Sequence, residues 1–407
     1  MEAIQLARFN ATWSWCQGER AFYRHWKTAN SLPEQIADLS ELDSFPQLTK
    51  TDIRENEDLI FAESSRGSTY TTGGSTAEPT LFPRDPAERA EQYADNYVGR
   101  AWWGIGPTDR RVLVWGHSHL YGTGLRSVVS RADRGVRDRL TNTLRLDGYR
   151  ISEADARDHL DAILRFKPTN VVGYSSALHR IALAASVRDR AELASLRLRG
   201  VVATAETLTA NEAETISSVF GCPVIIEYGA AEAGVLAVSR ETTWNIEVLW
   251  NSHILRQPDE RGAVISTLKA RRFPLINFSL GDEVLPAAVS ESGSIFALTR
   301  INGRINESVS LRQITGGTRA VSALQITHIL KGHDATRAVQ FSQARDNAAV
   351  VHIELRSDGN LRDVTDHLLR TISAEYPDLD TSAITVRQEQ NQQYTLAGKH
   401  RVMRLEG

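Results

Sequence analysis

The chain has 407 residues, of which 41% are hydrophobic, 24% are charged and 7% are aromatic. This composition is ordinary for a folded protein of two or three domains, and it excludes the disordered and fibrous classes. The 47 basic and 50 acidic side chains leave a formal charge of −3. We therefore expect no global attraction to nucleic acid or to an anionic membrane surface.

Cysteine use and hydropathy predict a cytoplasmic protein. Cys16 and Cys222 are too few for a disulfide framework, and neither lies in a CxxC pair. Charged and polar residues interrupt the first 24 residues, which therefore do not look like a signal peptide. No stretch approaches the roughly 18–20 apolar residues of a membrane helix.

The first 230 residues predict a parallel sheet covered by helices. Residues 1–60 look helical and connecting, and residues 67–83 form a loop rich in Gly, Thr and Ser. Residues 112–115 read as a strand. Short β-rich runs at 171–174, 201–203 and 224–228 then alternate with helical stretches at 153–166, 176–187 and 210–219. This alternation is typical of parallel α/β architecture.

The remaining residues predict a small barrel-like addition and a second domain. The shorter runs at 263–266 and 275–278 suit antiparallel strands. Further on, strands are expected at 348–355 and 384–388, and Leu361, Val364, Leu368 and Ile372 form one helical stripe. We place the domain boundary at 304–306, which gives an α/β protein with domains at 1–303 and 304–407.

One loop is built to approach a phosphate closely. Residues 71–79 read Thr-Thr-Gly-Gly-Ser-Thr-Ala-Glu-Pro and offer hydroxyls and unobstructed backbone amides. No Lys follows a second Gly at the spacing of the nucleoside-triphosphatase loop. Taken alone, such a cluster is more often a flexible turn. The sequence contains no H-E-x-x-H motif, no G-x-S-x-G motif and no G-x-G-x-x-G motif after a strand. It therefore does not predict a protease, a hydrolase or a dehydrogenase.

Six further segments follow in a recognisable order. They are Gly-Tyr-Ser at 173–175, Ala-Glu-Thr-Leu at 205–208, Glu-Tyr-Gly-Ala-Ala-Glu-Ala-Gly at 227–234, Phe-Ser-Leu-Gly-Asp at 278–282, Asn-Gly-Arg at 302–304 and Gly-Lys at 398–399. Together they resemble the adenylate-forming ligases, most closely the branch of phenylacetate–coenzyme A ligases and CapK-like proteins. The segments at 22–24 and 45–52 also look like that branch. The resemblance implies a large adenylate-forming core domain at 1–303 and a small mobile α+β lid domain at 304–407.

The resemblance implies an ATP site assembled from these motifs. The phosphates would be bound by Thr72, Gly73, Gly74, Ser75, Thr76 and Ala77, and the rest of the nucleotide by Ala205, Glu206, Thr207, Glu227, Tyr228, Gly229, Ala230, Ala231, Asp282 and Arg304. Tyr228 offers a flat face for adenine, and Asp282 offers two oxygens to the ribose hydroxyls. Glu232 resembles the magnesium ligand beside the α-phosphate. From the residues alone, Tyr228 could equally be a core tyrosine and Asp282 part of a turn.

Lys399 is the residue to which the resemblance gives the main catalytic role, beside Glu232 and Arg304. An ammonium group stabilises the negative charge that develops when an oxygen attacks the α-phosphorus. A lysine in a charged tail is usually only solvated, but this chain has six lysines in all. The family's hinge position falls on Asn306.

The acid pocket is implied to lie at the segment 115–121 and the neighbouring motifs. Its expected residues are His117, His119, Tyr121, Gly173, Tyr174, Ser175, Ala203, Ala233 and Gly234. Aromatic groups with a few polar ones suit a flat aryl acid. His117 and His119 alternate along a strand-like run, so at most one readily faces the pocket, and a core position is an equal alternative.

The resulting hypothesis is ATP- and magnesium-dependent activation of a small aromatic carboxylic acid as acyl-adenylate, with release of pyrophosphate and transfer to coenzyme A. One alternative is direct transfer to an amine or hydroxyl, which gives an amide or ester in biosynthesis. Another is a non-catalytic nucleotide-binding protein, suggested by Ala77 and Ala231 where the family has Gly and Thr. The resemblance also allows a homodimer.

Overall fold

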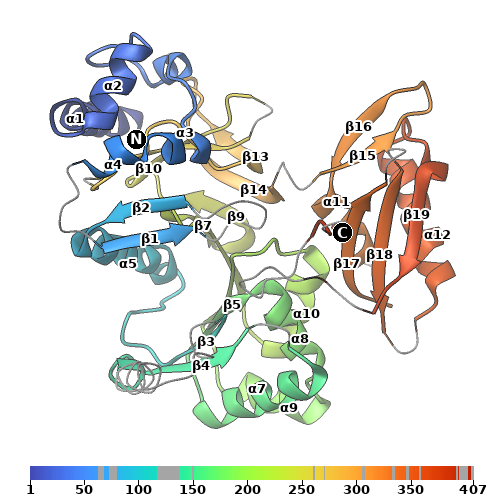
Figure 1. Ribbon diagram of the computed structural model, residues 1–407. Helices are drawn as coiled ribbons and strands as arrows, with labels where there is room; N and C mark the ends of the chain where they lie inside the picture. The colour runs from blue at the N-terminus through green and yellow to red at the C-terminus, as the bar shows by residue number, and fades with distance from the viewer. Residues whose placement is uncertain are drawn as a thin grey trace.

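A nine-stranded mixed sheet forms the centre of the described part of the molecule (Figure 1). The computed structural model describes residues 1–62, 68–72, 80–116, 137–148, 151–259, 262–269, 271–304, 308–331, 335–344, 348–356, 359–390, 393 and 402–404. The strand order is β13-β14-β9-β8-β7-β6-β5-β3-β4. The strands are β3 (Arg111–Trp115), β4 (Thr143–Asp147), β5 (Asn170–Tyr174), β6 (Gly200–Thr204), β7 (Val224–Ala230), β8 (Gly234–Arg240), β9 (Thr242–Val248), β13 (Asp282–Val289) and β14 (Ile295–Arg304).

The sheet is parallel in one half and antiparallel in the other. Strands β4, β3, β5, β6 and β7 pair in parallel. The sequence predicts β3, β5, β6 and β7, whereas β4 was not predicted. From β7 onward the pairs through β8, β9, β14 and β13 are antiparallel. The antiparallel half was not predicted. Short turns join β7 to β8, β8 to β9 and β13 to β14, while the strands β10, β11 and β12 lie between β9 and β13 in the chain. The direction of pairing therefore changes at β7.

The helices between the parallel strands lie close to their predicted positions, with one correction. Helix α7 (Glu153–Phe166) and helix α10 (Ala210–Phe220) match the prediction. The single helix predicted at 176–187 is wrong, because α8 (Ser175–Leu183) ends early and α9 (Val187–Ser195) begins after it. Ser186 caps α9 by accepting a hydrogen bond from the Asp189 amide, so a new helix begins there.

Both faces of the parallel strands are buried. Val171 and Val201 pack into the larger core, with residues of α7, α8 and α10. Their neighbours Val172 and Val202 point to the opposite face, where they meet β8 and the segment that follows α5 (Pro86–Ala101). This two-sided burial explains the continuous apolar runs in these strands.

The N-terminal region is helical and is fastened to a small antiparallel sheet. It contains α1 (Glu2–Glu19), α2 (Ala21–Ala29), η1 (Leu39–Ser44), α3 (Lys50–Glu55) and α4 (Glu57–Phe61), and the small sheet contains β10 (His253–Arg256), β11 (Val264–Thr267) and β12 (Phe278–Ser279). The Leu48 amide donates to the Asn277 carbonyl over 3.0 Å, and the Ser279 amide donates to the Leu48 carbonyl over 2.9 Å. These bonds place the start of α3 next to β12.

The predicted loop at 67–83 contains two strands, so that prediction is wrong at both ends. Strands β1 (Ser68–Thr72) and β2 (Thr80–Arg84) form an antiparallel hairpin in which Thr72 pairs with Thr80. Both strands contain Thr and an aromatic residue, types that favour extended backbone. The segment 73–79 lies outside the described residues.

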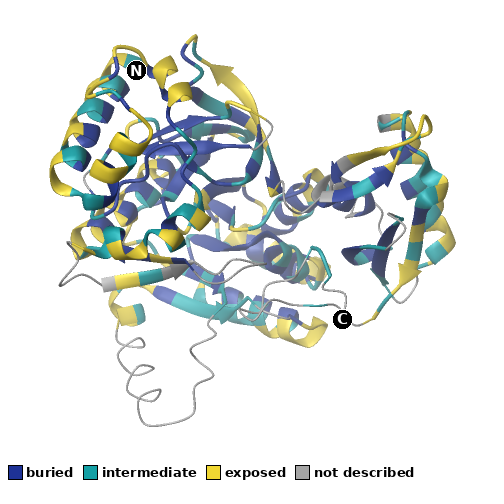
Figure 2. Cartoon of the chain, turned by 45° about the horizontal axis from the view of Figure 1, so that its top comes forward, coloured by how far each residue is buried: buried dark blue, intermediate teal, exposed yellow. Residues whose placement is uncertain are grey.

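The C-terminal elements have a hydrophobic core of their own and lie to one side of the large sheet (Figure 1). They are β15 (Ser308–Arg312), β16 (Thr318–Ser322), α11 (Ala323–Lys331), β17 (Thr336–Gln343), β18 (Ala349–Leu355), α12 (Leu361–Glu375), η3 (Thr381–Ala383) and β19 (Ile384–Gln388). Val364, Leu368 and Ile372 are buried, as their spacing predicts. Figure 2 shows buried residues in the interior of this part of the chain and exposed residues along its outer edge. Within the described ranges, no helix is both long and apolar enough to cross a membrane.

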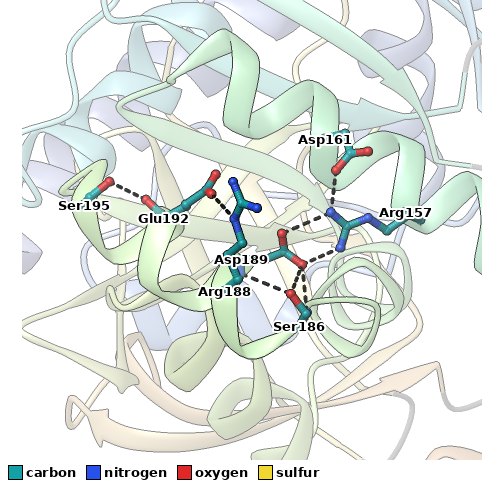
Figure 3. Close-up of polar contacts among 7 residues, drawn as sticks. All are labelled: Arg157, Asp161, Ser186, Arg188, Asp189, Glu192 and Ser195. Atoms are coloured by element: carbon teal, nitrogen blue, oxygen red, sulfur yellow. Dashed lines mark hydrogen bonds and ion pairs between the residues drawn. The ribbon is translucent and has the colours of Figure 1, made fainter.

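Helices α7 and α9 are joined by a polar cluster (Figure 3). Arg157 binds Asp189, with a 3.0 Å hydrogen bond from Nη2 to Oδ1, and it also binds Asp161. The same Asp189 carboxylate accepts hydrogen bonds from the Ser186 amide and hydroxyl, at 2.8 and 2.6 Å. The hydrogen bonds from Arg157 and Ser186 lower the pKa of Asp189. The Asp189 side chain is 6% exposed, so water has little access to the carboxylate and cannot replace the hydrogen bonds from Arg157 and Ser186.

We predict that Asp189→Ala lowers the free energy of unfolding by about 1–3 kcal/mol, because it removes the carboxylate half of the capping box with Ser186 and leaves Arg157 without its main partner. Urea denaturation measures the change. Since folding lowers this pKa, the stabilisation is present above the ordinary carboxyl pKa of about 3.9 and is lost as pH falls through the lower folded value. The difference between wild type and variant should therefore shrink in acid.

Glu192→Ala on the same helix is the matched control, since its partner Arg188 is 87% exposed. We expect a change below about 0.5 kcal/mol. Equal losses in the two variants would contradict the role given to Asp189.

Candidate active site

The turn between β7 and β8 carries a buried acid that is paired with a lysine from the N-terminal region. Glu232 is 4% exposed, and its Oε1 lies 2.5 Å from Lys50 Nζ. Lys50 begins α3, which Thr49 caps by accepting a 3.2 Å hydrogen bond from the Asp52 amide. Lys50 lies in the segment 45–52, and the sequence alone predicts no role for it. Its rarity, as one of six lysines, was the available signal.

The same turn is tightly folded. The Tyr70 hydroxyl donates to the Glu232 carbonyl over 3.0 Å, and Arg271 donates to the Glu232 and Ala233 carbonyls over 3.1 and 2.7 Å. A Cβ at Gly229 would lie 2.6 Å from the Gly234 carbonyl oxygen. Gly234 has a φ of +89°, which favours glycine. These two glycines let β7 and β8 meet closely around Glu232.

A second cluster lies at the junction of β7, β13 and β14. The Tyr228 hydroxyl donates to Asp282 Oδ2 over 2.8 Å, and Arg304 Nε lies 3.7 Å from Asp282 Oδ1. Asp282 and Arg304 face each other across the β13–β14 pair. Burial raises the pKa of Asp282, whereas Arg304 and the Tyr228 hydroxyl act to lower it. Glu232 and Lys50 also act electrostatically on Asp282, so the two clusters form one charged site.

Glu227 points away from this cluster. Its neighbour along β7 is Tyr228, and adjacent side chains on a strand point to opposite faces of the sheet. The Glu227 carboxylate binds Arg100 of α5 through two buried hydrogen bonds of 2.8 and 2.9 Å. Because its side chain is engaged with Arg100, Glu227 could contact ATP at the predicted site only through its backbone. Gly229, Ala230 and Ala231 continue the same segment toward the turn.

The segment 205–207 is joined to the start of α8. Glu206 Oε2 accepts hydrogen bonds from the Ser176 amide and hydroxyl, at 3.0 and 2.6 Å. The Ser175 hydroxyl donates to the Glu206 carbonyl over 3.2 Å. Ala205 has a φ of +63°, a left-handed conformation that glycine adopts at lower cost. Thr207, two residues further on, is partly buried.

An aromatic stack lies at the ends of β3 and β5. The rings of Trp115 and Tyr174 are 4.4 Å apart with an interplanar angle of 28°. A Cβ at Gly148 would lie 2.9 Å from the Tyr174 ring, so a small residue is needed beside the stack. Of the predicted acid-pocket residues, Gly173, Tyr174, Ser175, Ala203, Ala233 and Gly234 lie in the described part of the chain.

Several predicted site residues lie outside the described residues. They are Gly73, Gly74, Ser75, Thr76, Ala77, His117, His119, Tyr121, Asn306 and Lys399. The backbone of Thr72 ends β1 and thus locates the start of the predicted phosphate loop. The flanks of the segment containing Lys399 are both attached to β17: the Gln393 amide donates to Gln340 Oε1 and the Phe341 amide to the Val402 carbonyl, each over 2.9 Å.

Known proteins resemble the chain at low sequence identity. No family model matches it. Protein CapK of Staphylococcus aureus is 22% identical over 320 residues, which cover 76% of this chain and 69% of that protein. A 2-hydroxyisobutyryl-CoA ligase in the postadenylation state, in complex with 2-HIB-AMP, has a TM-score of 0.73 at 16% identity. That match covers 100% of this chain and 89% of the ligase.

Two other solved structures extend the comparison. The anthranilate CoA ligase AuaEII, in complex with anthranoyl-AMP, has a TM-score of 0.53 at 16% identity, and the match covers 82% of this chain and 65% of that one. The amide bond synthetase McbA from Marinactinospora thermotolerans has a TM-score of 0.54 at 14% identity, with 81% and 66% covered. The 2-hydroxyisobutyryl-CoA ligase gives lower TM-scores of 0.60 in its open conformation and 0.58 in its thioesterification state.

The chain therefore has the fold of the adenylate-forming ligases, and the resemblance predicted from its motifs is confirmed at that level. The matching enzymes include acyl-CoA ligases and an amide bond synthetase. Among the three states of the 2-hydroxyisobutyryl-CoA ligase, the postadenylation state gives the highest TM-score. Because the three structures are of the same ligase, the differences in TM-score reflect its conformation.

We predict that Lys50→Met lowers the free energy of unfolding by about 1–3 kcal/mol, because the buried Glu232 carboxylate loses its cation. The double variant Lys50→Met/Glu232→Gln should regain most of that loss, because it removes the uncompensated charge. Lys27→Met is the control, since its partner Glu34 is exposed, and we expect a change below about 1 kcal/mol. A double variant no more stable than Lys50→Met would contradict the ion pair.

Proposed function

We propose that this protein is an ATP-dependent ligase that activates a small, aromatic carboxylic acid as acyl-adenylate and releases pyrophosphate. The observation that carries the proposal is the site formed by Tyr228, Asp282 and Arg304 beside Glu232 and Lys50. A flat ring and two carboxylates, each with a cation beside it, suit a nucleotide with its ribose and phosphates. The fold of the adenylate-forming ligases supports the same reaction.

Each side chain of the site has a role that its surroundings support. The ring of Tyr228 would lie against adenine while its hydroxyl orients Asp282, whose ionised carboxylate would accept the ribose hydroxyls. Arg304 acts to lower the pKa of Asp282, against the effect of burial, and so favours the ionised carboxylate. Lys50 brings a positive charge to Glu232, next to the hairpin of the predicted phosphate loop at 72–77.

Glu232 is the residue that would hold a magnesium ion. Magnesium is usually bound by one or two carboxylates together with substrate phosphates and water, so a single carboxylate with one oxygen facing Lys50 fits this use. Bound there, the ion would neutralise phosphate charge. Among the described residues no three His, Cys, Asp or Glu side chains gather into a metal cluster.

In the reaction, an oxygen of the acid attacks the α-phosphorus and pyrophosphate leaves, so the acyl-adenylate retains the α-phosphate. We assign stabilisation of the charge on the phosphoryl oxygens to Lys399.

We propose that residues 304–407 act as a lid on the core domain 1–303, with Asn306 as hinge. Such a lid would exclude water from the acyl-adenylate. The better match to a postadenylation state supports this arrangement.

The choice of acid rests on the stack of Trp115 and Tyr174, whose flat apolar surfaces favour an aryl or heteroaryl group. We propose coenzyme A as the acceptor, supported by the similarity to acyl-CoA ligases, with the transfer taking place in the cytoplasm. The second candidate is transfer to an amine, which the similarity to an amide bond synthetase favours. Four charged residues that match the family motifs argue against a non-catalytic nucleotide-binding protein: Glu232, Asp282, Arg304 and Lys399.

We predict that Lys399→Ala lowers kcat for pyrophosphate release by about 100-fold or more, while the Kd for ATP changes less than about threefold. Coupled pyrophosphate detection and calorimetry measure the two quantities. Lys27→Ala, a lysine of α2, is the control and should retain full activity. Unchanged turnover in Lys399→Ala would remove that lysine from the mechanism.

We also predict that Arg304→Met shifts the acid limb of the pH profile of ATP binding to higher pH. Burial already raises the pKa of Asp282, and removing the nearby cation raises it further, so the carboxylate that binds ribose is lost at a higher pH. Calorimetry across pH measures the shift. Arg300→Met, an exposed position on the same strand, is the control. A profile that does not move would contradict the proposed contact of Asp282 with ribose.

A further inference from the structure

The backbone carbonyl of Glu232 accepts two hydrogen bonds from side chains that come from distant parts of the chain. The Tyr70 hydroxyl donates to it over 3.0 Å and Arg271 Nη1 over 3.1 Å. Arg271 Nη2 also donates to the next carbonyl, that of Ala233, over 2.7 Å. Two donors on one oxygen and a third on its neighbour fix the plane of these peptides, and thereby the direction in which the Glu232 side chain leaves the turn.

Tyr70 ties this turn to the β1–β2 hairpin. Its ring stacks on Phe82 of β2 with centroids 5.3 Å apart, and the Arg84 guanidinium lies 4.7 Å from the ring centroid. These contacts hold the ring between two partners and aim the hydroxyl at Glu232. The strands of this hairpin precede and follow the segment 73–79 in the chain. Tyr70 therefore connects the strand that leads into the predicted phosphate loop with the turn that carries the predicted magnesium ligand.

Arg271 ties the turn to the small sheet from the other side. The residue is 8% exposed. Its third partner is the ring of His253, with 3.4 Å between Nη2 and Nε2. Burial and the neighbouring Arg271 and Lys269 lower the pKa of His253, so this imidazole stays neutral and can accept. In the described part of the chain, the hydrogen-bond partners of Arg271 are two carbonyls and a neutral imidazole. None of these partners neutralises the guanidinium, so a positive charge lies next to the turn that carries Glu232.

We propose that Tyr70 and Arg271 are positioning residues of the adenylation site, which act by holding the Glu232 carbonyl. This inference rests on the proposed function for its catalytic consequence. Without one donor the turn can rotate, and the Glu232 carboxylate drifts relative to Lys50 and the hairpin. The adenosine end is bound separately, by Tyr228 and Asp282, so the loss falls on turnover and not on ATP affinity.

The test compares Tyr70→Phe, Arg271→Lys and the double variant. Tyr70→Phe removes one oxygen and keeps the ring contacts, so it should fold normally. We expect kcat for pyrophosphate release to fall about five- to tenfold in each single variant, with the KM for ATP within about twofold. The double variant should lose less than the product of the two, because both donors act on the same turn. Tyr93→Phe, a tyrosine 50% exposed on α5, is the control.

Hydrogen exchange of the amides at 230–235 in the ligand-free protein gives a second readout that needs no turnover. Both single variants should exchange faster there than wild type, and Tyr93→Phe should not. Faster exchange together with an inactive wild type would support the positioning role and count against the proposed function. Unchanged exchange in both variants would overturn the inference whatever their activity, and so would faster exchange with unchanged kcat in an active enzyme.

Discussion

The buried ion pair between Lys50 and Glu232 is the contact on which the arrangement of the site depends. A carboxylate this far from water is costly unless a cation and hydrogen-bond donors accompany it. Lys50 can reach it only because the segment before α3 is bonded to β12, and Tyr70 and Arg271 hold the backbone of the same turn. The ion pair therefore requires the N-terminal region, the β1–β2 hairpin, the large sheet and the small sheet to be in place together.

The site lies where the sheet changes from parallel to antiparallel pairing. Strand β7 is the last of the parallel strands and the first of the antiparallel ones, and both Tyr228 and Glu232 lie at its carboxyl end. Open α/β sheets bind ligands outside the carboxyl ends of their strands, at points where the order changes. The antiparallel half then returns the chain through β13 and β14, which brings Asp282 and Arg304 to the same place. One change of strand direction thus brings two distant motifs together.

Local patterns predicted much of the fold and part of the site. The apolar runs of β5 and β6 and the helices α7 and α10 could be read directly, because their periodicity reflects burial on one or two faces. The resemblance assigned Tyr228 and Asp282 to one expected ATP site, and the hydrogen bond between them is an observation of the structure. Lys50, Tyr70 and Arg271 could not be found in this way, because each meets Glu232 through tertiary packing that leaves no pattern in the neighbouring sequence. The break between α8 and α9 was not predicted, because helical periodicity alone does not show that Ser186 caps a new helix.

The central claim is that the protein forms an acyl-adenylate, and trapping that intermediate tests it most directly. Wild-type protein would be incubated with ATP labelled at the α-phosphate, magnesium, hydroxylamine and a panel of aryl, heteroaryl and aliphatic acids, with and without coenzyme A. The account predicts pyrophosphate, labelled AMP and the hydroxamate of an aromatic acid, with a thioester replacing the hydroxamate when coenzyme A is present. Tight ATP binding with no pyrophosphate or hydroxamate from any acid would contradict it.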